Sequence, residues 1–388
     1  MKKLLTLDVT SALFLKEIAT SKNITRAHLS KLSGLTKTTV SGVVSYLSDS
    51  GLITESALSS DSTEYSGTGR RPTVLTLSPS SPLICGMLVR RGSLSVTLSG
   101  IDGKIVSILE YPYESIDNDT VINMLTEMFF RLKSKTTRTV LGIGLACLGP
   151  LRLSERMILK PNNFYGIENL RIAEELEKRI DLPVIMQNDI SAGAMAEYLY
   201  GNGREEKSFI YLHIMNGIGS GIILNGSLYS GASGNAGDIA HMTVNMFGGR
   251  CSCGGTGCLE SYANIERLRA HVSLLSGRDT SSLTFKKLIS DLNSGDTVSR
   301  SALQEYTAAL SVALSGMLHC LDISTVIFGY DGCENGNELL ILLEKNLRLR
   351  MENSGQGTVN VKRSAFLSDA PLIGATAIVA EKIFGGVN

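Results

Sequence analysis

Residues 241–260 read HMTVNMFGGRCSCGGTGCLE and place one histidine and three cysteines at the spacing His-x9-Cys-x-Cys-x4-Cys. Three thiolates and one imidazole complete the tetrahedral shell of a closed structural zinc site, and the glycines let the backbone turn tightly round the ion. The alternative, three unliganded cysteines beside an unrelated histidine, fits this density of cysteines poorly. We therefore expect one structural Zn²⁺ per chain, bound by His241, Cys251, Cys253 and Cys258.

The composition is that of a folded protein with no net charge. The 388 residues allow two or three domains, and 43% of them are hydrophobic against 19% charged. Lysine plus arginine equals aspartate plus glutamate at 37 each, so any affinity for nucleic acid must be local. Residues 1–78 hold nine basic against six acidic side chains, a mild excess that permits DNA binding.

Neither an export signal nor a membrane span is predicted. Asp8, Lys16 and Glu17 interrupt the apolar residues at the start of the chain, and no run of about 18 apolar residues follows. We therefore expect a cytoplasmic protein. In a reducing compartment, clustered cysteines indicate a metal site instead of disulfides.

The first 79 residues have the order of parts of a winged helix-turn-helix. Helical spacing of apolar residues predicts three helices, and alternation then predicts two strands that form the wing. Thr25 and Thr36 are the expected N-caps, and Gly34 is expected to end the second helix. The predicted elements are helices within 11–20, 25–34 and 36–51 and strands at 52–54 and 72–78.

The third helix and the wing carry the side chains suited to DNA. Small polar groups at the start of that helix suit base edges and phosphates, and two arginines in the wing loop suit a groove or a phosphate. The alternative is a winged helix used only for protein contact. The expected DNA-binding residues are Lys37, Thr38, Thr39, Ser41, Arg70 and Arg71.

Pro79 and Pro82 mark a boundary, beyond which strands and helices alternate in an α/β pattern. Asn188-Asp189 end an apolar strand before a helix, where α/β folds present ligand-binding groups. The same pair also serves as an ordinary helix cap. The glycine-rich stretch 216–221 is likewise more typical of a hairpin turn than of a phosphate site. These motifs need context.

Two stretches of sequence help to interpret these motifs, LYSGASGNAGDIAHMTVN at 228–245 and CSCGGTGCLESYAN at 251–264. Both stretches closely resemble the ROK family of repressors, open reading frames and sugar kinases, and the resemblance covers nearly everything after residue 80. The first 80 residues resemble the DNA-binding extension of its repressor branch, the branch of the N-acetylglucosamine and xylose repressors. The resemblance therefore implies a two-part chain of α/β class.

The implied fold is a winged helix-turn-helix followed by a two-lobed actin-like or hexokinase-like domain of the ribonuclease H-like kind. Its small lobe is expected to include the C-terminal helix, and its large lobe the zinc site. The expected ranges are 1–79 for the winged helix-turn-helix, 80–388 for the second domain, about 80–190 plus 370–388 for the small lobe, and about 191–369 for the large lobe.

The resemblance also implies a sugar site. Asn188 and Asp189 match the sugar-contacting pair, whose aspartate is the general base in kinase members. His241 matches the histidine of a Gly-Glu-x-x-His element, so that one ring nitrogen would face the sugar and the other the metal. Asp238 replaces the glutamate of that element, and its shorter side chain would alter which sugar is accepted. The implied sugar-binding residues are Asn162, Asn188, Asp189, Asp238, His241 and Glu260.

The nucleotide motifs of the kinase members are degraded. Residues 85–95 lack an acidic residue and Gly-Gly-Thr, and residues 215–219 read Met-Asn-Gly-Ile-Gly. Tyr330 replaces a glycine on the adenosine side, where its side chain would intrude. Phosphoryl transfer depends on positioning the nucleotide phosphates. We therefore expect no enzyme and no catalytic residue, with Asp189 at the general-base position, while residual sugar kinase activity stays open.

The sequence thus predicts a sugar-responsive repressor of carbohydrate-utilisation genes. Its expected partners are operator DNA, a sugar or sugar phosphate effector, and a second copy of the chain in a homodimer, with a tetramer as the alternative. The rival is an ATP-dependent sugar kinase, of the glucokinase or N-acetylhexosamine kinase type, that carries an extra domain. A third hypothesis is a regulator that responds to a partner protein. The missing phosphate loop favours the repressor over the kinase.

Overall fold

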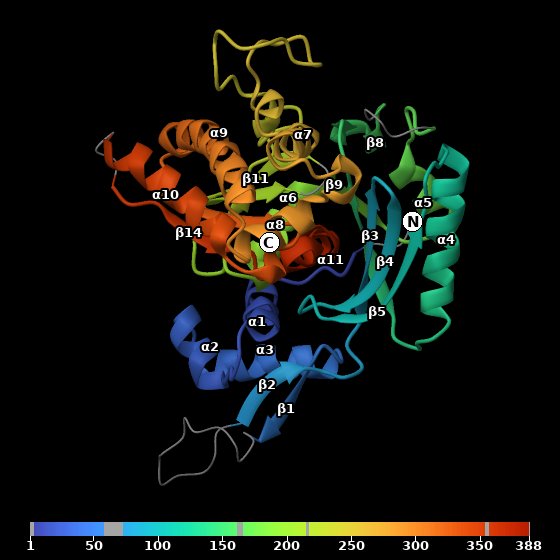
Figure 1. The fold of residues 1–388 in the computed structure, drawn as a ribbon. Helices are drawn as coiled ribbons and strands as arrows, with labels where there is room; N and C mark the ends of the chain where they lie inside the picture. Colours follow the sequence, from blue (N-terminus) through green and yellow to red (C-terminus); the bar gives the residue numbers. More distant parts are fainter. Residues whose placement is uncertain (1–3, 58–72, 161–165, 215–216, 354–356, 388) are drawn as a thin grey trace. The chain divides into compact units, whose positions relative to one another are not determined.

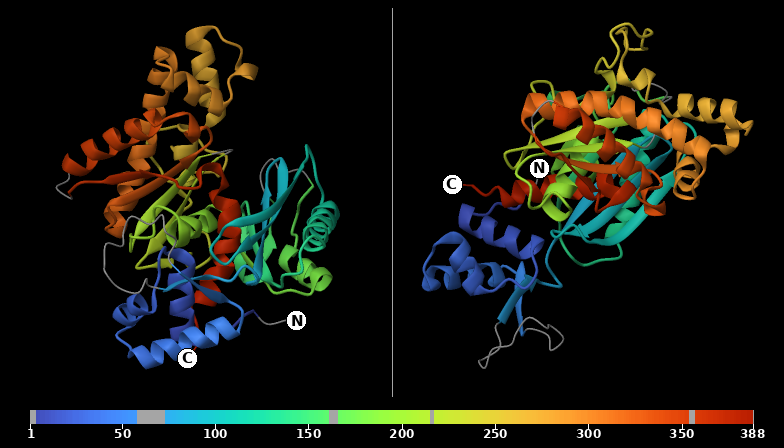
Figure 2. Two further views of the ribbon diagram at one scale, coloured as in Figure 1. Left: turned by 90° about the horizontal axis from the view of Figure 1, so that it is seen from below. Right: turned by 60° about the vertical axis from the view of Figure 1, so that its left-hand side comes forward.

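A computed structural model of the protein describes residues 4–57, 73–160, 166–214, 217–353 and 357–387 (Figure 1). The chain divides into two compact units, and each unit is built from more than one segment of the sequence. Both units pack helices on a mixed sheet, as the further views show (Figure 2). The first unit is 1–146, 162–187 and 375–388, and the second is 147–161 and 188–374.

Three short helices and a hairpin open the first unit. Asp8, Thr25 and Thr36 accept hydrogen bonds from the first free backbone N–H groups of these helices, which is the stabilising role of an N-cap. Gly34 ends the second helix at a φ of 70°, a backbone conformation that glycine adopts without strain. The elements are α1 (Val9–Thr20), α2 (Arg26–Ser33), α3 (Lys37–Asp49), β1 (Ile53–Ala57) and β2 (Thr73–Leu77).

These five elements confirm the order predicted for a winged helix-turn-helix. The apolar faces of the helices meet in a small core, and β1 pairs antiparallel with β2, with Ile53 opposite Leu77. The residues that join the two strands, including Arg70 and Arg71, lie outside the described residues. The fully buried core side chains include Phe14, Leu15, Leu29, Val40, Val44 and Leu47.

The sheet of the first unit has the strand order β5-β4-β3-β6-β9. Its central strands β3 and β4 are buried almost throughout, whereas the edge strand β5 alternates between exposed and half-buried positions. Strand β5 was not predicted from the sequence. The strands are β3 (Leu83–Arg90), β4 (Ser93–Gly100), β5 (Ile105–Pro112), β6 (Val140–Cys147) and β9 (Val184–Asn188), with helices α4 (Asn118–Lys133) and α5 (Ile172–Ile180).

The sheet of the second unit, β12-β11-β10-β13-β14, repeats the order third-second-first-fourth-fifth of the first sheet. Helix α6 packs on one face, where Gly193 leaves no room for a Cβ beside Tyr211. The elements are α6 (Asp189–Tyr200), β10 (Phe209–Ile214), β11 (Ile218–Leu224), β12 (Ser227–Leu228), α7 (Ile265–Ser276), α8 (Phe285–Asn293), α9 (Thr297–Leu321), β13 (Thr325–Tyr330), α10 (Glu338–Asn353) and β14 (Asn360–Arg363).

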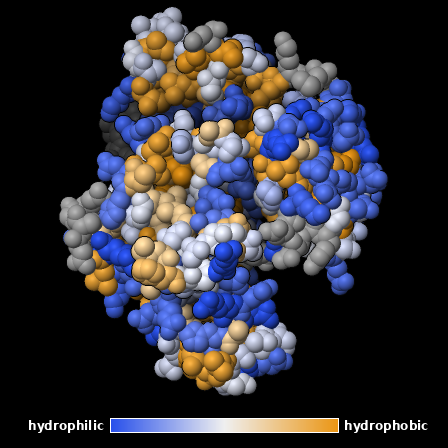
Figure 3. Space-filling model, turned by 90° about the horizontal axis from the view of Figure 1, so that it is seen from above, coloured by the Kyte–Doolittle hydropathy of each residue, from blue (hydrophilic) through white to orange (hydrophobic). Residues whose placement is uncertain are grey.

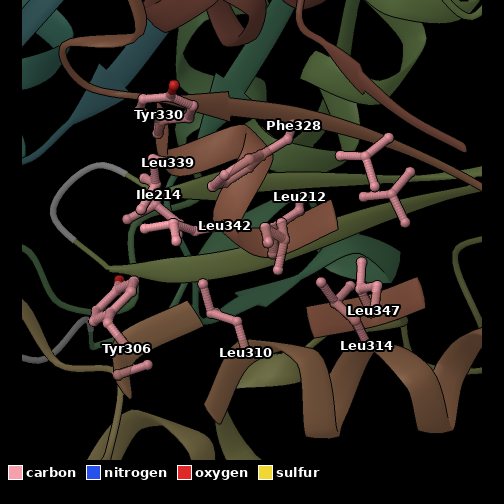
Figure 4. Close-up of a cluster of buried hydrophobic side chains, with 14 of the residues drawn as sticks. Leu212, Ile214, Tyr306, Leu310, Leu314, Phe328, Tyr330, Leu339, Leu342 and Leu347 are labelled. Atoms are coloured by element: carbon pink, nitrogen blue, oxygen red, sulfur yellow. The ribbon is translucent and has the colours of Figure 1, made fainter. Parts of the chain in front are cut away.

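The other face of this sheet forms the main core of the second unit. Leu212 and Ile214 of β10 and Phe328 of β13 meet Leu310 of α9 and Leu343 of α10 there, and Figure 4 shows most of these side chains pointing toward one another. Burying such a side chain stabilises the fold by about 1.5–3 kcal/mol, so this core fixes the sheet that carries the site.

The short strands β7 (Leu151–Arg152) and β8 (Met157–Ile158) and the C-terminal helix α11 (Ala370–Phe384) complete the fold. No helix in the described part of the chain is long and apolar enough to cross a membrane. Hydrophilic and hydrophobic residues are mixed in small groups on the face shown in Figure 3. The separate domain at 1–79 and the lobe boundaries stay predictions.

Candidate functional site

The four predicted metal ligands lie together. One ligand atom from each of His241, Cys251, Cys253 and Cys258 lies within 4.8 Å of the others. The Sγ atoms of Cys253 and Cys258 are 3.7 Å apart, and Cys251 Sγ is 3.8 Å from His241 Nδ1. A tetrahedral shell with zinc–sulfur bonds of about 2.3 Å has edges of about 3.8 Å. The spacing and the donor set therefore suit zinc.

Glycines shape the loop that holds these ligands. Cys251 N donates to Gly255 O at 2.8 Å, and Gly254 N donates to Cys251 O at 3.0 Å, so the chain turns tightly around Cys253. Gly257 has a φ of 66°, and a Cβ there would lie 1.7 Å from Asn245 O. A side chain at 257 would therefore open the loop.

The thiols differ in their pKa values. Hydrogen bonds, first from the Cys253 backbone N–H, lower the pKa of Cys251 to about 6, so this thiol ionises readily at neutral pH. Burial and then the neighbouring thiols raise the pKa of Cys258 to about 12. Thiolate is the form that binds metal. A bound cation would therefore favour the thiolate form of Cys258, whose pKa the metal-free surroundings raise.

The loop before the cysteines is fastened to strand β11. Ser220 donates to Gly237 O twice, from its backbone N at 3.1 Å and from its Oγ at 2.7 Å. Asp238 follows directly, and the short helix Ile239–His241 brings the histidine to the metal ligands. Sequence reasoning missed Ser220, because its role depends on a contact 17 residues away.

The second part of the predicted sugar site is the start of α6. Asn188 is the N-cap, and its Oδ1 accepts from Ile190 N at 3.0 Å and from Ser191 N at 3.2 Å. Asn188 therefore serves as the helix cap that its sequence context suggested, and Asp189 opens the helix beside it. Cys147, which sequence reasoning also missed, is buried, and its pKa is raised by burial and then by the Asp189 carboxylate.

Strand β11 contacts both parts of the predicted sugar site, the loop that carries Asp238 and the helix α6. A Cβ on Gly219 would lie 2.3 Å from Ile190 Cδ1, and one on Gly221 would lie 2.7 Å from Ala194 Cβ. Helix α6 thus lies directly on the glycines of β11, one residue from the serine that holds the Asp238 loop. The glycine-rich stretch therefore has a packing role in this chain.

Glu260 joins the predicted sugar residues to the metal ligands. Its Oε2 lies 3.9 Å from His241 Nδ1, and both side chains are partly exposed. His241 thus turns Nδ1 toward both Cys251 and Glu260. Asn162 lies outside the described residues. The other five predicted sugar residues, Asn188, Asp189, Asp238, His241 and Glu260, all belong to the second unit.

Tyr330 corrects one expectation about the nucleotide site. The tyrosine was expected to intrude where a nucleotide would bind, but its side chain is fully buried in the core. Its ring centroid is 4.6 Å from that of Phe328, and its hydroxyl donates to Gly336 O at 3.1 Å. Alternation along β13 turns residues 328 and 330 to the same face of the sheet, which is the core face.

The predicted DNA-binding residues that the structure describes lie at the start of α3. Lys37, Thr38 and Thr39 are exposed and Ser41 is half-buried. The Oγ1 atoms of Thr39 and Thr36 lie 3.0 Å apart, so the Thr39 hydroxyl also supports the N-cap. The N-terminus of a helix attracts phosphates. This end of α3 can therefore contact a nucleic acid backbone.

Comparisons with known proteins match this geometry. The model of the ROK family matches residues 91–382, and the chain belongs to the ROK family. The xylose repressor of Bacillus spizizenii is 27% identical over 377 residues, which are 96% of this chain and 95% of that protein. The glucokinase of Thermotoga maritima is 28% identical over 307 residues, which are 76% of this chain and 96% of that enzyme.

A solved structure extends the likeness to the whole fold. The crystal structure of a ROK family transcriptional regulator, described as a homologue of the Mlc protein of Escherichia coli, has a TM-score of 0.79 to this chain. It is 23% identical and covers 97% of this chain and 96% of its own. Repressors therefore match the N-terminal module as well as the family domain, whereas the glucokinase leaves about a quarter of this chain unmatched.

Proposed function

We propose that this protein is a sugar-responsive transcriptional regulator that represses carbohydrate-utilisation genes. The observation that carries the proposal is the joining of a winged helix-turn-helix to a ROK family domain in one chain. The full-length match to a xylose repressor supports it. The partners would be operator DNA, bound by α3 and the wing, and a second copy of the chain, and the location would be cytoplasmic.

The effector would bind through Asn188, Asp189, Asp238, His241 and Glu260. This set offers carboxylates that accept hydrogen bonds from hydroxyls, together with an amide and an imidazole, and sugars present many hydroxyls to such groups. The repressor relatives suggest D-xylose as the first sugar to test. Asp238 is one methylene shorter than the glutamate of the family motif and would alter which sugar is accepted, so several sugars should be tested.

Zinc would have a structural role in this function. His241, Cys251, Cys253 and Cys258 would hold one ion per chain, with no open position for catalysis. When bound, the ion would fix the orientation of the His241 ring and hold the short helix Ile239–His241 in place. The metal would thus shape the sugar site without touching the sugar.

Kinase chemistry is the alternative, and two features argue against it. The first strand pair of the family domain carries Arg90 and Arg91 in place of a glycine-rich phosphate loop, and Arg90 is engaged with Ser93 and Glu110. The glycines of β11 pack against α6. Asp189 would then accept a hydrogen bond from a sugar hydroxyl without removing its proton. Residual sugar kinase activity is tested by measuring sugar-dependent ATP turnover.

A binding selection tests the proposal. The full-length protein should enrich one duplex with two symmetric half-sites from a pool of random DNA, because a two-fold dimer reads a palindrome. One of D-xylose, D-glucose and N-acetylglucosamine should change the affinity for that duplex. Failure to enrich any sequence would overturn the regulator, and sugar-dependent ATP turnover at about 1–100 per second would favour the kinase.

A further inference from the structure

Glu197, in the last turns of α6, is a carboxylate with no exposed surface. Its Oε1 accepts hydrogen bonds from Ser364 Oγ at 2.5 Å and Ala365 N at 2.9 Å, with Phe366 N at 3.5 Å. Its Oε2 accepts from Asn202 N at 2.9 Å. Burial raises its pKa while these donors oppose the rise. A buried carboxylate with several donors holds its surroundings in one arrangement.

The segment that Glu197 holds leads into helix α11. Residues 364–366 follow strand β14 and precede Ala370, where α11 begins. A second contact joins α6 to α11 itself, because a Cβ on Gly374 would lie 2.1 Å from Ala192 O. Helix α6 therefore contacts both the segment that leads into α11 and the start of α11, all within the second unit.

The other end of α11 reaches the winged helix-turn-helix. Val387 N donates to Leu7 O at 2.9 Å, and a Cβ on Gly386 would lie 2.9 Å from Val9 Cα at the start of α1. Between Gly374 and Ala375 the helix passes from the second compact unit to the first. Helix α11 thus starts beside α6, and the residues that follow its end lie beside α1.

We propose that Glu197 is a positioning residue that couples the sugar-binding start of α6 to α11, and through α11 to the winged helix-turn-helix. This inference rests on the proposed sugar-responsive function. Asp189 and Glu197 are eight residues apart on one helix, about 12 Å along its axis. A ligand that moves the start of α6 must also move the carboxylate that holds residues 364–366.

Hydrogen exchange on the full-length protein tests this coupling. D-Xylose, D-glucose and N-acetylglucosamine are each added, and amide exchange is followed in residues 370–387 and 7–20. The wild-type protein should show a sugar-dependent change in both segments. Glu197→Gln, in which an amide NH₂ faces backbone donors, should bind the same sugar with unchanged Kd by calorimetry and lose that change. Ser364→Ala removes one bond to the same carboxylate and should weaken the change.

Asp291 provides the matched control, because it is also a buried carboxylate on a helix of the second unit, bonded to Arg278 at 2.9 Å. Asp291→Asn should keep the sugar-dependent change. If Glu197→Gln does not fold, Ser364→Ala decides the question. A full change retained in the variants of Glu197 and Ser364 would overturn the coupling, as would a wild type that binds sugar without any change in 370–387. A wild type that binds none of the sugars overturns the sugar function, and the coupling with it.

Discussion

The single residue with the most roles in the site is His241. Its Nδ1 lies near both Cys251 and Glu260, so it stands between the metal ligands and the predicted sugar ligands. Metal-bound histidines are oriented by a second partner on the ring. The cysteine spacing predicted its metal role, and the family resemblance implied its sugar role, which stays a prediction.

Removal of one thiol should empty the metal centre. We expect Cys253→Ser to carry less than one zinc per chain, because three ligands leave an incomplete tetrahedral shell. Metal analysis of the purified protein measures this. Cys320→Ser, which changes an exposed cysteine on α9, should keep one zinc per chain. Full zinc occupancy in the Cys253 variant would refute the ligand assignment.

Asp189 should matter for sugar affinity. We expect Asp189→Asn to weaken sugar binding by roughly 10- to 100-fold, the range for a hydrogen bond to a charged group. Calorimetry with the sugar that the wild type binds is the measurement. The control is Asp322→Asn at the exposed C-cap of α9, where asparagine also adopts the left-handed backbone. Equal affinities in the two variants would remove Asp189 from the site.

Among the elements, those with local signals were predictable from sequence. Helices α1, α2 and α3 were recognised because Thr25, Thr36 and Gly34 mark their ends, and apolar spacing marks their faces. Strand β5 was missed because an edge strand buries little on either face. Helices α7, α8 and α10 were missed as well. The role of Glu197 depends on partners about 170 residues away, and sequence spacing carries no signal for such contacts.

In the candidate site, too, residues marked by a local motif were predictable, and residues that depend on distant contacts were not. The metal ligands lie within 18 residues and carry a spacing motif, and the structure confirms that they lie together. Ser220 has no motif, because only the folded sheet brings it to Gly237. Tyr330 was misjudged because its role depends on the face of β13 to which the side chain turns. Local chemistry was therefore predictable, and contacts between distant segments were not.

The start of α3 should contact a DNA phosphate through Lys37. We expect Lys37→Ala to weaken binding to the selected duplex and to reduce the slope of log affinity against log salt by about 0.9, since one fewer counterion is released. Fluorescence anisotropy across a salt series measures the slope. Lys104→Ala changes an exposed lysine paired with Asp102 and should leave the slope unchanged. An unaltered slope in the Lys37 variant would exclude that phosphate contact.

At the scale of the whole molecule, the family domain has the paired sheets of a kinase-like fold, and the predicted sugar residues match those of the family at every position but Asp238. Both sheets follow one strand order, which indicates a common plan for the two halves of the domain. In the proposed function the N-terminal module adds a second binding surface, so that one chain would combine a place for a small effector with a place for DNA.

The stability of the whole protein should report which ligand it accepts. We expect the sugar, at 100 times its Kd, to stabilise the folded protein by about 2.7 kcal/mol and so to raise the Tm. MgATP should leave the Tm unchanged, because the phosphate loop is absent. Differential scanning fluorimetry compares the two. A rise with MgATP similar to that with sugar would restore the kinase hypothesis.

The parallel bridge between Asp8 and Val387 has a practical consequence for handling the protein. Because the bridge is parallel, the chain leaves residue 387 heading the same way as the chain that enters α1. An affinity tag fused at the C-terminus therefore emerges beside α1, within the module proposed to bind DNA. Purification for DNA-binding work should use a cleavable tag, removed before any affinity is measured.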